Sequence, residues 1–158
     1  MDSKTVRAVI IDDEEDARDI LERLLLRHGN ILIVGKANNA EAGFEKICRQ
    51  RPDLIFLDVQ MPGEDGFGVV ERMQRQQIQI PVIFVTAFVE YAVEAIKNSA
   101  FDYLLKPVNF GELQKTMERF MREKQNSWAG QDIDKLLRLI GQKDKICFNT
   151  RTGYIYVN

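Results

Sequence analysis

The sequence is poor in the residues that hold disulfide-rich and zinc-binding folds together. Its 158 residues include two cysteines, Cys48 and Cys147, which are far apart and have no CxxC spacing. A disulfide framework or a structural zinc site needs more such residues at closer spacing, so the sequence argues against both. Free thiols are typical of a reducing compartment, and we expect a cytoplasmic protein.

Long apolar runs are also missing. The longest cover only a few residues, such as Leu54–Leu57, whereas a membrane-spanning helix needs about 20. The N-terminal segment 1–5 lacks the apolar stretch of a secretory signal. The net charge is −2, so the bulk of the chain offers no positive surface for nucleic acid. We therefore expect neither a membrane segment nor DNA binding by this chain alone.

What the sequence does contain is a regular alternation of apolar runs and helical patterns. Strands are predicted for 6–11, 31–34, 54–57, 81–85 and 103–105, and each is followed by apolar residues at helical spacing. Strands that are apolar throughout are buried on both faces, which is typical of a parallel sheet covered by helices. The predicted fold class is therefore α/β, with a doubly wound, five-stranded parallel sheet.

Polar side chains follow the ends of four of these strands. They are Asp12 and Asp13, Asp58, Thr86 and Lys106. Right-handed crossovers bring the carboxyl ends of parallel strands to one edge of the sheet, where ligands bind. No glycine-rich phosphate loop follows the first strand, so the pattern does not favour a nucleotide site.

The chemistry of this set favours phosphoryl transfer. Three carboxylates in one cleft repel each other unless a cation lies among them, and oxygen ligands suit Mg²⁺. A carboxylate can attack phosphorus to give an acyl phosphate. The Lys106 ammonium would neutralise the phosphoryl oxygens, and the Thr86 hydroxyl could hydrogen-bond to them.

Four motifs, 11–14, 57–63, 85–87 and 101–107, resemble those of the receiver domain of two-component response regulators. The resemblance covers residues 4–124. It implies a flavodoxin-like sheet with the strand order 2-1-3-4-5. It also implies a signalling switch that takes a phosphoryl group from a histidine kinase, and not an enzyme.

The resemblance assigns a role to each matching residue. Asp58 would be the phosphoacceptor, and Mg²⁺ would be held by Asp12, Asp13, Asp58 and the backbone carbonyl of Gln60. Lys106 would pair with the phosphoryl group, Thr86 would shift towards it, and Tyr103 would be the aromatic switch. The Lys106–Pro107 peptide is usually cis in this family. The face made by helix four, strand five and helix five, with Tyr91, Tyr103 and Phe110, would carry a partner or a second copy.

The segments beyond the receiver region differ in character. Residues 125–144 are predicted to be a linker with a short amphipathic helix, because Ile133, Leu136, Leu137 and Ile140 repeat at helical spacing. Residues 145–158 favour a hairpin and resemble the opening strands of a LytTR-type DNA-binding domain. That resemblance implies a truncated transcription regulator that would bind DNA only with a complete output domain.

Several alternatives stay open at this point. Asp12 or Asp13 alone could cap the first helix, and Tyr103 could be a half-buried strand residue without a switching role. The whole chain could be a degenerate receiver that only binds other proteins, or a phosphatase of the haloacid dehalogenase type. We also hypothesise that Phe88, two residues beyond Thr86, slows hydrolysis of an acyl phosphate by blocking water.

Overall fold

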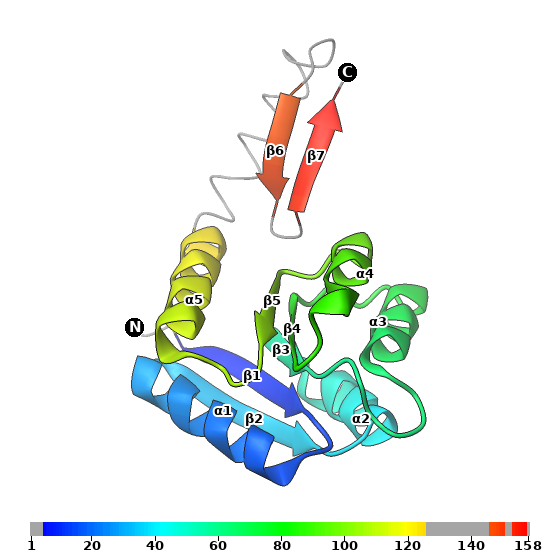
Figure 1. Ribbon diagram of the computed structural model, residues 1–158, viewed down its shortest axis with the longest axis vertical. Helices are drawn as coiled ribbons and strands as arrows, with labels where there is room; N and C mark the ends of the chain where they lie inside the picture. The colour runs from blue at the N-terminus through cyan, green and yellow to red at the C-terminus, as the bar shows by residue number, and fades with distance from the viewer. Residues whose placement is uncertain (1–4, 126–145, 151–152, 158) are drawn as a thin grey trace.

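The computed structural model describes residues 5–125, 146–150 and 153–157. The first part contains β1 (Val6–Ile11), α1 (Glu15–His28), β2 (Ile31–Ala37), α2 (Ala40–Gln50), β3 (Leu54–Leu57), α3 (Gly66–Arg75), β4 (Val82–Thr86), the 3-10 helix η1 (Val89–Tyr91), α4 (Ala92–Lys97), β5 (Asp102–Leu105) and α5 (Phe110–Gln125). β1 to β5 form a parallel sheet in the order β2-β1-β3-β4-β5 (Figure 1). The predicted fold class and strand order are therefore confirmed.

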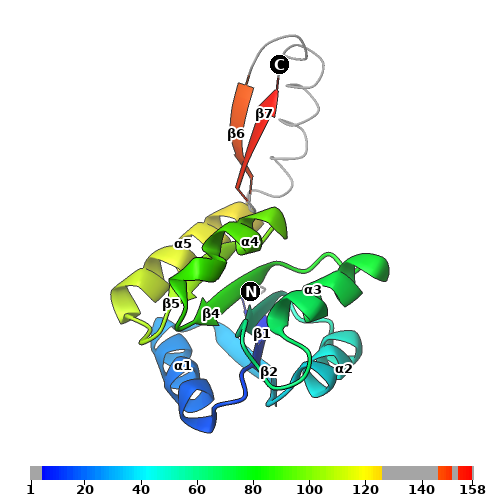
Figure 2. The same cartoon turned by 45° about the vertical axis from the view of Figure 1, so that its right-hand side comes forward.

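The continuous apolar strands supply two cores, one on each face of the sheet. In β3, Ile55 and Leu57 pack with the residues of α2 and α3, whereas Leu54 and Phe56 pack with those of α1 and α5. Successive side chains of a strand point to opposite faces, so a central strand must be apolar at every position. Figures 1 and 2 show the helices on both faces of the sheet.

Two helices begin at capping residues that the sequence makes recognisable. The side chain of Asn39 accepts a hydrogen bond from the backbone of Ala42 at the start of α2. The side chain of Asp65 does the same for Gly68 at the start of α3. Such caps satisfy backbone N–H groups that have no partner within the helix, and the Asp65 cap fixes where the loop after β3 ends.

The fourth helix differs from the sequence pattern. Tyr91, Ala92, Ala95 and Ile96 predict a helix after the fourth strand, and the structure has the 3-10 helix η1 followed by a six-residue α4. Ala95 is buried, whereas Ile96 is 65% exposed. Neighbouring helical residues lie about 100° apart around the axis, and here the side of α4 that carries Ala95 packs into the core. Val89 and Val93 are also exposed on these elements.

The remaining described residues form the predicted C-terminal hairpin. β6 (Ile146–Thr150) and β7 (Gly153–Val157) pair antiparallel, with Ile146 opposite Val157. Except for residue 125, which ends α5, the predicted linker with its amphipathic helix lies outside the described residues. None of the helices in the described part is long and apolar enough to cross a membrane.

Candidate functional site

The strand order brings the carboxyl ends of β1, β3, β4 and β5 side by side. Asp12 directly follows β1, Asp58 directly follows β3, Thr86 ends β4 and Lys106 directly follows β5. Backbone hydrogen bonds between neighbouring strands extend to these residues. The Lys106 N–H donates to the Thr86 carbonyl at 2.8 Å, and the Asp58 N–H donates to the Ile11 carbonyl at 2.9 Å. The sequence-predicted residues therefore meet at one edge of the sheet.

Three carboxylates cluster at this edge. One carboxylate oxygen from each of Asp12, Asp13 and Asp58 lies within 4.8 Å of the others. Asp12 and Asp58 are each only 5% exposed, whereas Asp13 faces solvent. Burial, above all, raises the pKa of Asp12, and the nearby Asp58 carboxylate adds to the rise although Lys106 opposes it. So much negative charge in one place favours a cation.

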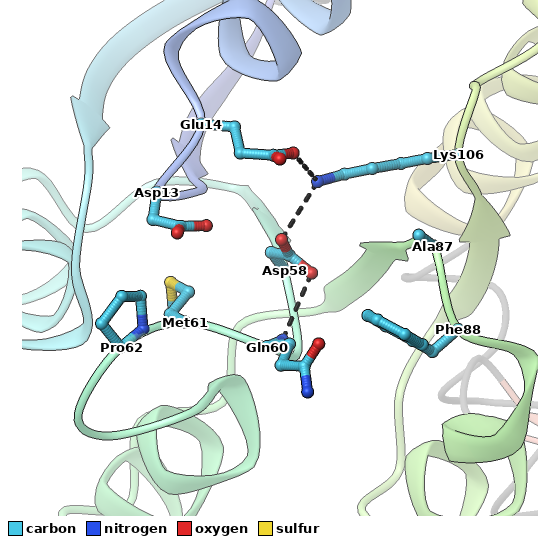
Figure 3. Close-up of a pocket in the computed structure, with 9 residues that line it drawn as sticks. All are labelled: Asp13, Glu14, Asp58, Gln60, Met61, Pro62, Ala87, Phe88 and Lys106. Atoms are coloured by element: carbon cyan, nitrogen blue, oxygen red, sulfur yellow. Dashed lines mark hydrogen bonds and ion pairs between the residues drawn. The ribbon is translucent and has the colours of Figure 1, made fainter.

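The amine of Lys106 lies among the acids. Its Nζ is 2.8 Å from an Asp12 oxygen, 3.0 Å from an Asp58 oxygen and 3.1 Å from a Glu14 oxygen. Burial disfavours the ammonium, but the bonds to Asp12 and Asp58 outweigh it and hold the pKa of Lys106 above its usual value. Figure 3 shows Lys106 reaching Asp58 and Glu14 from the opposite wall. One ammonium thus pairs with three carboxylates, so the net charge of the site is negative.

Asp58 faces an open pocket of about 480 Å³. The pocket is lined by Asp13, Glu14, Asp58, Gln60, Met61, Pro62, Ala87, Phe88 and Lys106. One carboxylate oxygen of Asp58 accepts the Gln60 N–H at 3.3 Å, and the other bonds Lys106. The Asp58 carboxylate is therefore held in place by both oxygens yet faces the open pocket (Figure 3).

Thr86 and Tyr103 are both placed near this pocket. Thr86 is fully buried, and among the described residues its hydroxyl is the buried side-chain group that has no hydrogen-bond partner. An unpaired buried hydroxyl costs free energy, so it is suited to a partner that arrives later. Tyr103 is half-buried, and its hydroxyl donates to the backbone carbonyl of Phe88. Burial raises the pKa of Tyr103.

The alternative that the first aspartates merely cap α1 does not match the structure. The N-cap of α1 is Glu14, and it makes no side-chain cap bond. Asp12 accepts the Glu14 N–H at 2.9 Å while its other oxygen bonds Lys106. The Lys106–Pro107 peptide is cis, as the resemblance implied.

Sequence reasoning missed two features of the site. The motif 11–14 includes Glu14 but assigns it no role, whereas in the structure its carboxylate is a third partner of Lys106. Gly66 lies outside the four motifs, yet a Cβ there would lie 2.4 Å from the Asp58 carbonyl oxygen. A glycine at the first position of a helix capped by Asp65 is the signal that could have indicated this close approach.

Comparison with known proteins agrees with this geometry. Residues 8–118 match the model of the response regulator receiver domain family. The chain belongs to that family. This confirms the resemblance that the four motifs predicted and accounts for most of the described residues.

Curated relatives of this receiver chain are response regulators. It is 34% identical to the sensory transduction protein LytT of Bacillus subtilis, over 96% of this chain and 68% of LytT. It is 38% identical to the transcriptional regulatory protein BtsR of Escherichia coli, over 83% of this chain and 53% of BtsR. The chain spans about half the length of most of the relatives it matches.

Solved structures give the same fold. The receiver domain of AraT from Geobacillus stearothermophilus superposes with a TM-score of 0.71 at 26% identity, covering 78% of this chain and 98% of that domain. The signal receiver domain of NarL from Mycobacterium tuberculosis has a TM-score of 0.69 at 28% identity, covering 75% and 98%.

Proposed function

We propose that this receiver accepts a phosphoryl group on Asp58 from a histidine kinase. One observation carries the proposal: the Asp58 carboxylate faces an open pocket, bonds Lys106 at 3.0 Å and lies within 4.8 Å of two further acids. In the transfer, a bond forms between an Asp58 oxygen and phosphorus. The bond from phosphorus to the kinase imidazole nitrogen breaks, and that nitrogen takes up a proton.

Each neighbouring group has a part that follows from its position. The Lys106 ammonium would shift from the carboxylate to a phosphoryl oxygen, because that oxygen carries the new charge. The unpaired Thr86 hydroxyl would donate to another phosphoryl oxygen. Tyr103, whose hydroxyl bonds the backbone of Phe88, would move inward to fill the space that Thr86 vacates. Phosphorylation would thereby bias an equilibrium between two arrangements of this edge.

The residues also fit a Mg²⁺ ion. Oxygen donors from Asp12, Asp13 and Asp58, completed by the Gln60 backbone carbonyl, match the ligands that this ion prefers. The net negative charge left after pairing with Lys106 favours such a cation. Bound there, Mg²⁺ would neutralise the charge on the transferring phosphoryl group.

Asp13 should contribute to the metal site without contributing much to folding, because it is exposed. We expect Asp13→Asn to weaken Mg²⁺ binding at least about tenfold, since even groups behind the ligands change metal affinity that much. Calorimetric titration with Mg²⁺ measures this. Glu45→Gln, an exposed acid on α2, is the control and should bind as the wild type does; equal affinities for all three proteins would contradict the assignment.

We further propose which surface of the receiver contacts a partner and how the rest of the chain is organised. The elements η1, α4 and β5 expose Val89, Val93, Ile96 and Leu105, which supports the face of α4, β5 and α5 as a partner or homodimer surface. Residues 4–124 would form the receiver, 125–144 a linker and 145–158 the start of a LytTR-type output domain. The similarity to the transcriptional regulatory protein BtsR supports control of transcription. The protein would act in the cytoplasm, and DNA would be bound only by a complete output domain.

Intact-mass analysis after treatment with acetyl phosphate and Mg²⁺ tests the phosphoacceptor. The wild type should gain the mass of one phosphoryl group, and Asp58→Asn should gain none. An unmodified wild type would support the alternative of a module that only binds proteins. Steady turnover of a phosphomonoester would instead support the phosphatase alternative, although the spacing of Asp12 and Asp13 lacks the DxD pattern of that class.

A further inference from the structure

The ring of Phe88 forms part of the wall of the Asp58 pocket. Phe88 and Gln60 line the pocket together with the acceptor. Figure 3 shows the Phe88 ring directed inward from the segment that follows β4, on the side of Asp58 and Gln60. The ring therefore occupies space through which a water molecule would approach phosphorus on Asp58.

Aromatic contacts link this ring to the core. The Phe88 ring packs edge-on against Tyr91, with centroids 5.9 Å apart and planes at 73°. Tyr91 packs against Phe67 at 6.1 Å, and Phe67 against Phe84 of β4 at 4.9 Å. Phe84 is fully buried. Edge-to-face contacts at these distances are favourable, so the ring has a preferred place against the core.

A second contact fixes the backbone of the same residue. The hydroxyl of Tyr103, which belongs to the neighbouring strand β5, donates to the Phe88 carbonyl. Because burial raises the pKa of Tyr103, the hydroxyl keeps its proton at neutral pH. The loop after β4 is thus tied at Phe88 to β5, and rotation of that loop away from the pocket would break the bond.

We infer that Tyr103 is a positioning residue that lengthens the life of the phosphoryl group on Asp58 by holding the Phe88 ring in the pocket wall. This inference rests on the proposed function. In the hydrolysis that it slows, a water oxygen attacks phosphorus and the bond between phosphorus and Asp58 breaks. The carboxylate leaves, the water's protons pass to phosphate and solvent, and inorganic phosphate is released.

The test follows the decay of the phosphorylated mass after the phosphodonor has been removed. Tyr103→Phe, which deletes only the hydroxyl, should hydrolyse about two- to tenfold faster, the range expected for one lost hydrogen bond. Phe88→Ala should have at least as large an effect, and Phe88→Leu should restore part of the lifetime. Because Tyr103 acts through Phe88, the double variant should decay no faster than Phe88→Ala.

Tyr91→Phe is the matched control, since it keeps the ring that contacts Phe67 and Phe88, and its decay should equal that of the wild type. If Tyr103→Phe decays as the wild type does, or if the two effects multiply in the double variant, the inference is wrong. Absence of any phosphoryl mass in the wild type would instead overturn the proposed function, so the two failures are distinguishable.

Discussion

Lys106→Met is expected to lower the free energy of unfolding by about 2–3 kcal/mol in Mg²⁺-free buffer. The substitution leaves Asp12 and Asp58, each only 5% exposed, without the ammonium that lies 2.8 and 3.0 Å away. Removing one partner of a fully buried pair costs about 3–5 kcal/mol, and the open pocket lowers that figure. Urea unfolding at neutral pH, with and without Mg²⁺, measures the change.

Added Mg²⁺ should recover part of this loss, because a divalent cation among the three carboxylates supplies the missing charge. Lys97→Met, on the exposed end of α4, is the control and should unfold almost as the wild type does. If Lys106→Met and the wild type unfold at the same urea concentration in both buffers, the acids do not depend on Lys106. The Lys106 variant should also respond poorly to phosphodonors.

The second large effect is expected for Gly66→Ala. A Cβ at Gly66 would lie 2.4 Å from the Asp58 carbonyl oxygen and 3.1 Å from the Cα of Val59. Both atoms belong to the backbone, so the loop that carries Asp58 must move. Overpacking of this kind costs about 1–3 kcal/mol, and a displaced Asp58 should accept phosphoryl groups far more slowly.

Thermal unfolding and the rate of mass gain with acetyl phosphate check the two parts of this prediction. Gly35→Ala is the matched control, because its Cβ would mainly meet the flexible side chain of Lys46, at 3.1 Å. It should change the phosphorylation rate little. Normal phosphorylation of Gly66→Ala would show that the loop can shift without disturbing Asp58.

The central features of the site could be predicted because they depend on chain direction. Once the strands are parallel, Asp12, Asp58 and Lys106 must emerge at the same edge, whatever the details of packing. The contacts of surface loops could not be predicted in this way. The bond between Glu14 and Lys106 joins residues 92 positions apart, and its acid is exposed, so no apolar pattern marks it.

The burial of residues on the fourth helix could not be predicted from the sequence either. Its apolar residues fit more than one helical face, and the short η1–α4 segment leaves Ile96 exposed while Ala95 is buried. Only neighbouring elements decide which face of a six-residue helix is covered, because too few turns are present to define a stripe. The tie between Tyr103 and Phe88 likewise depends on how the loop after β4 lies against β5.

The sequence by itself determined the fold class, the parallel sheet and the edge at which acids, hydroxyl and amine gather, because apolar runs and strand direction leave few other arrangements. The tertiary structure alone decided which acids share Lys106, that the Thr86 hydroxyl lacks a partner among the described residues, and that Phe88 closes one wall of the pocket. These three features depend on distances between side chains that belong to different helices, strands and loops. They are fixed only when both cores are packed.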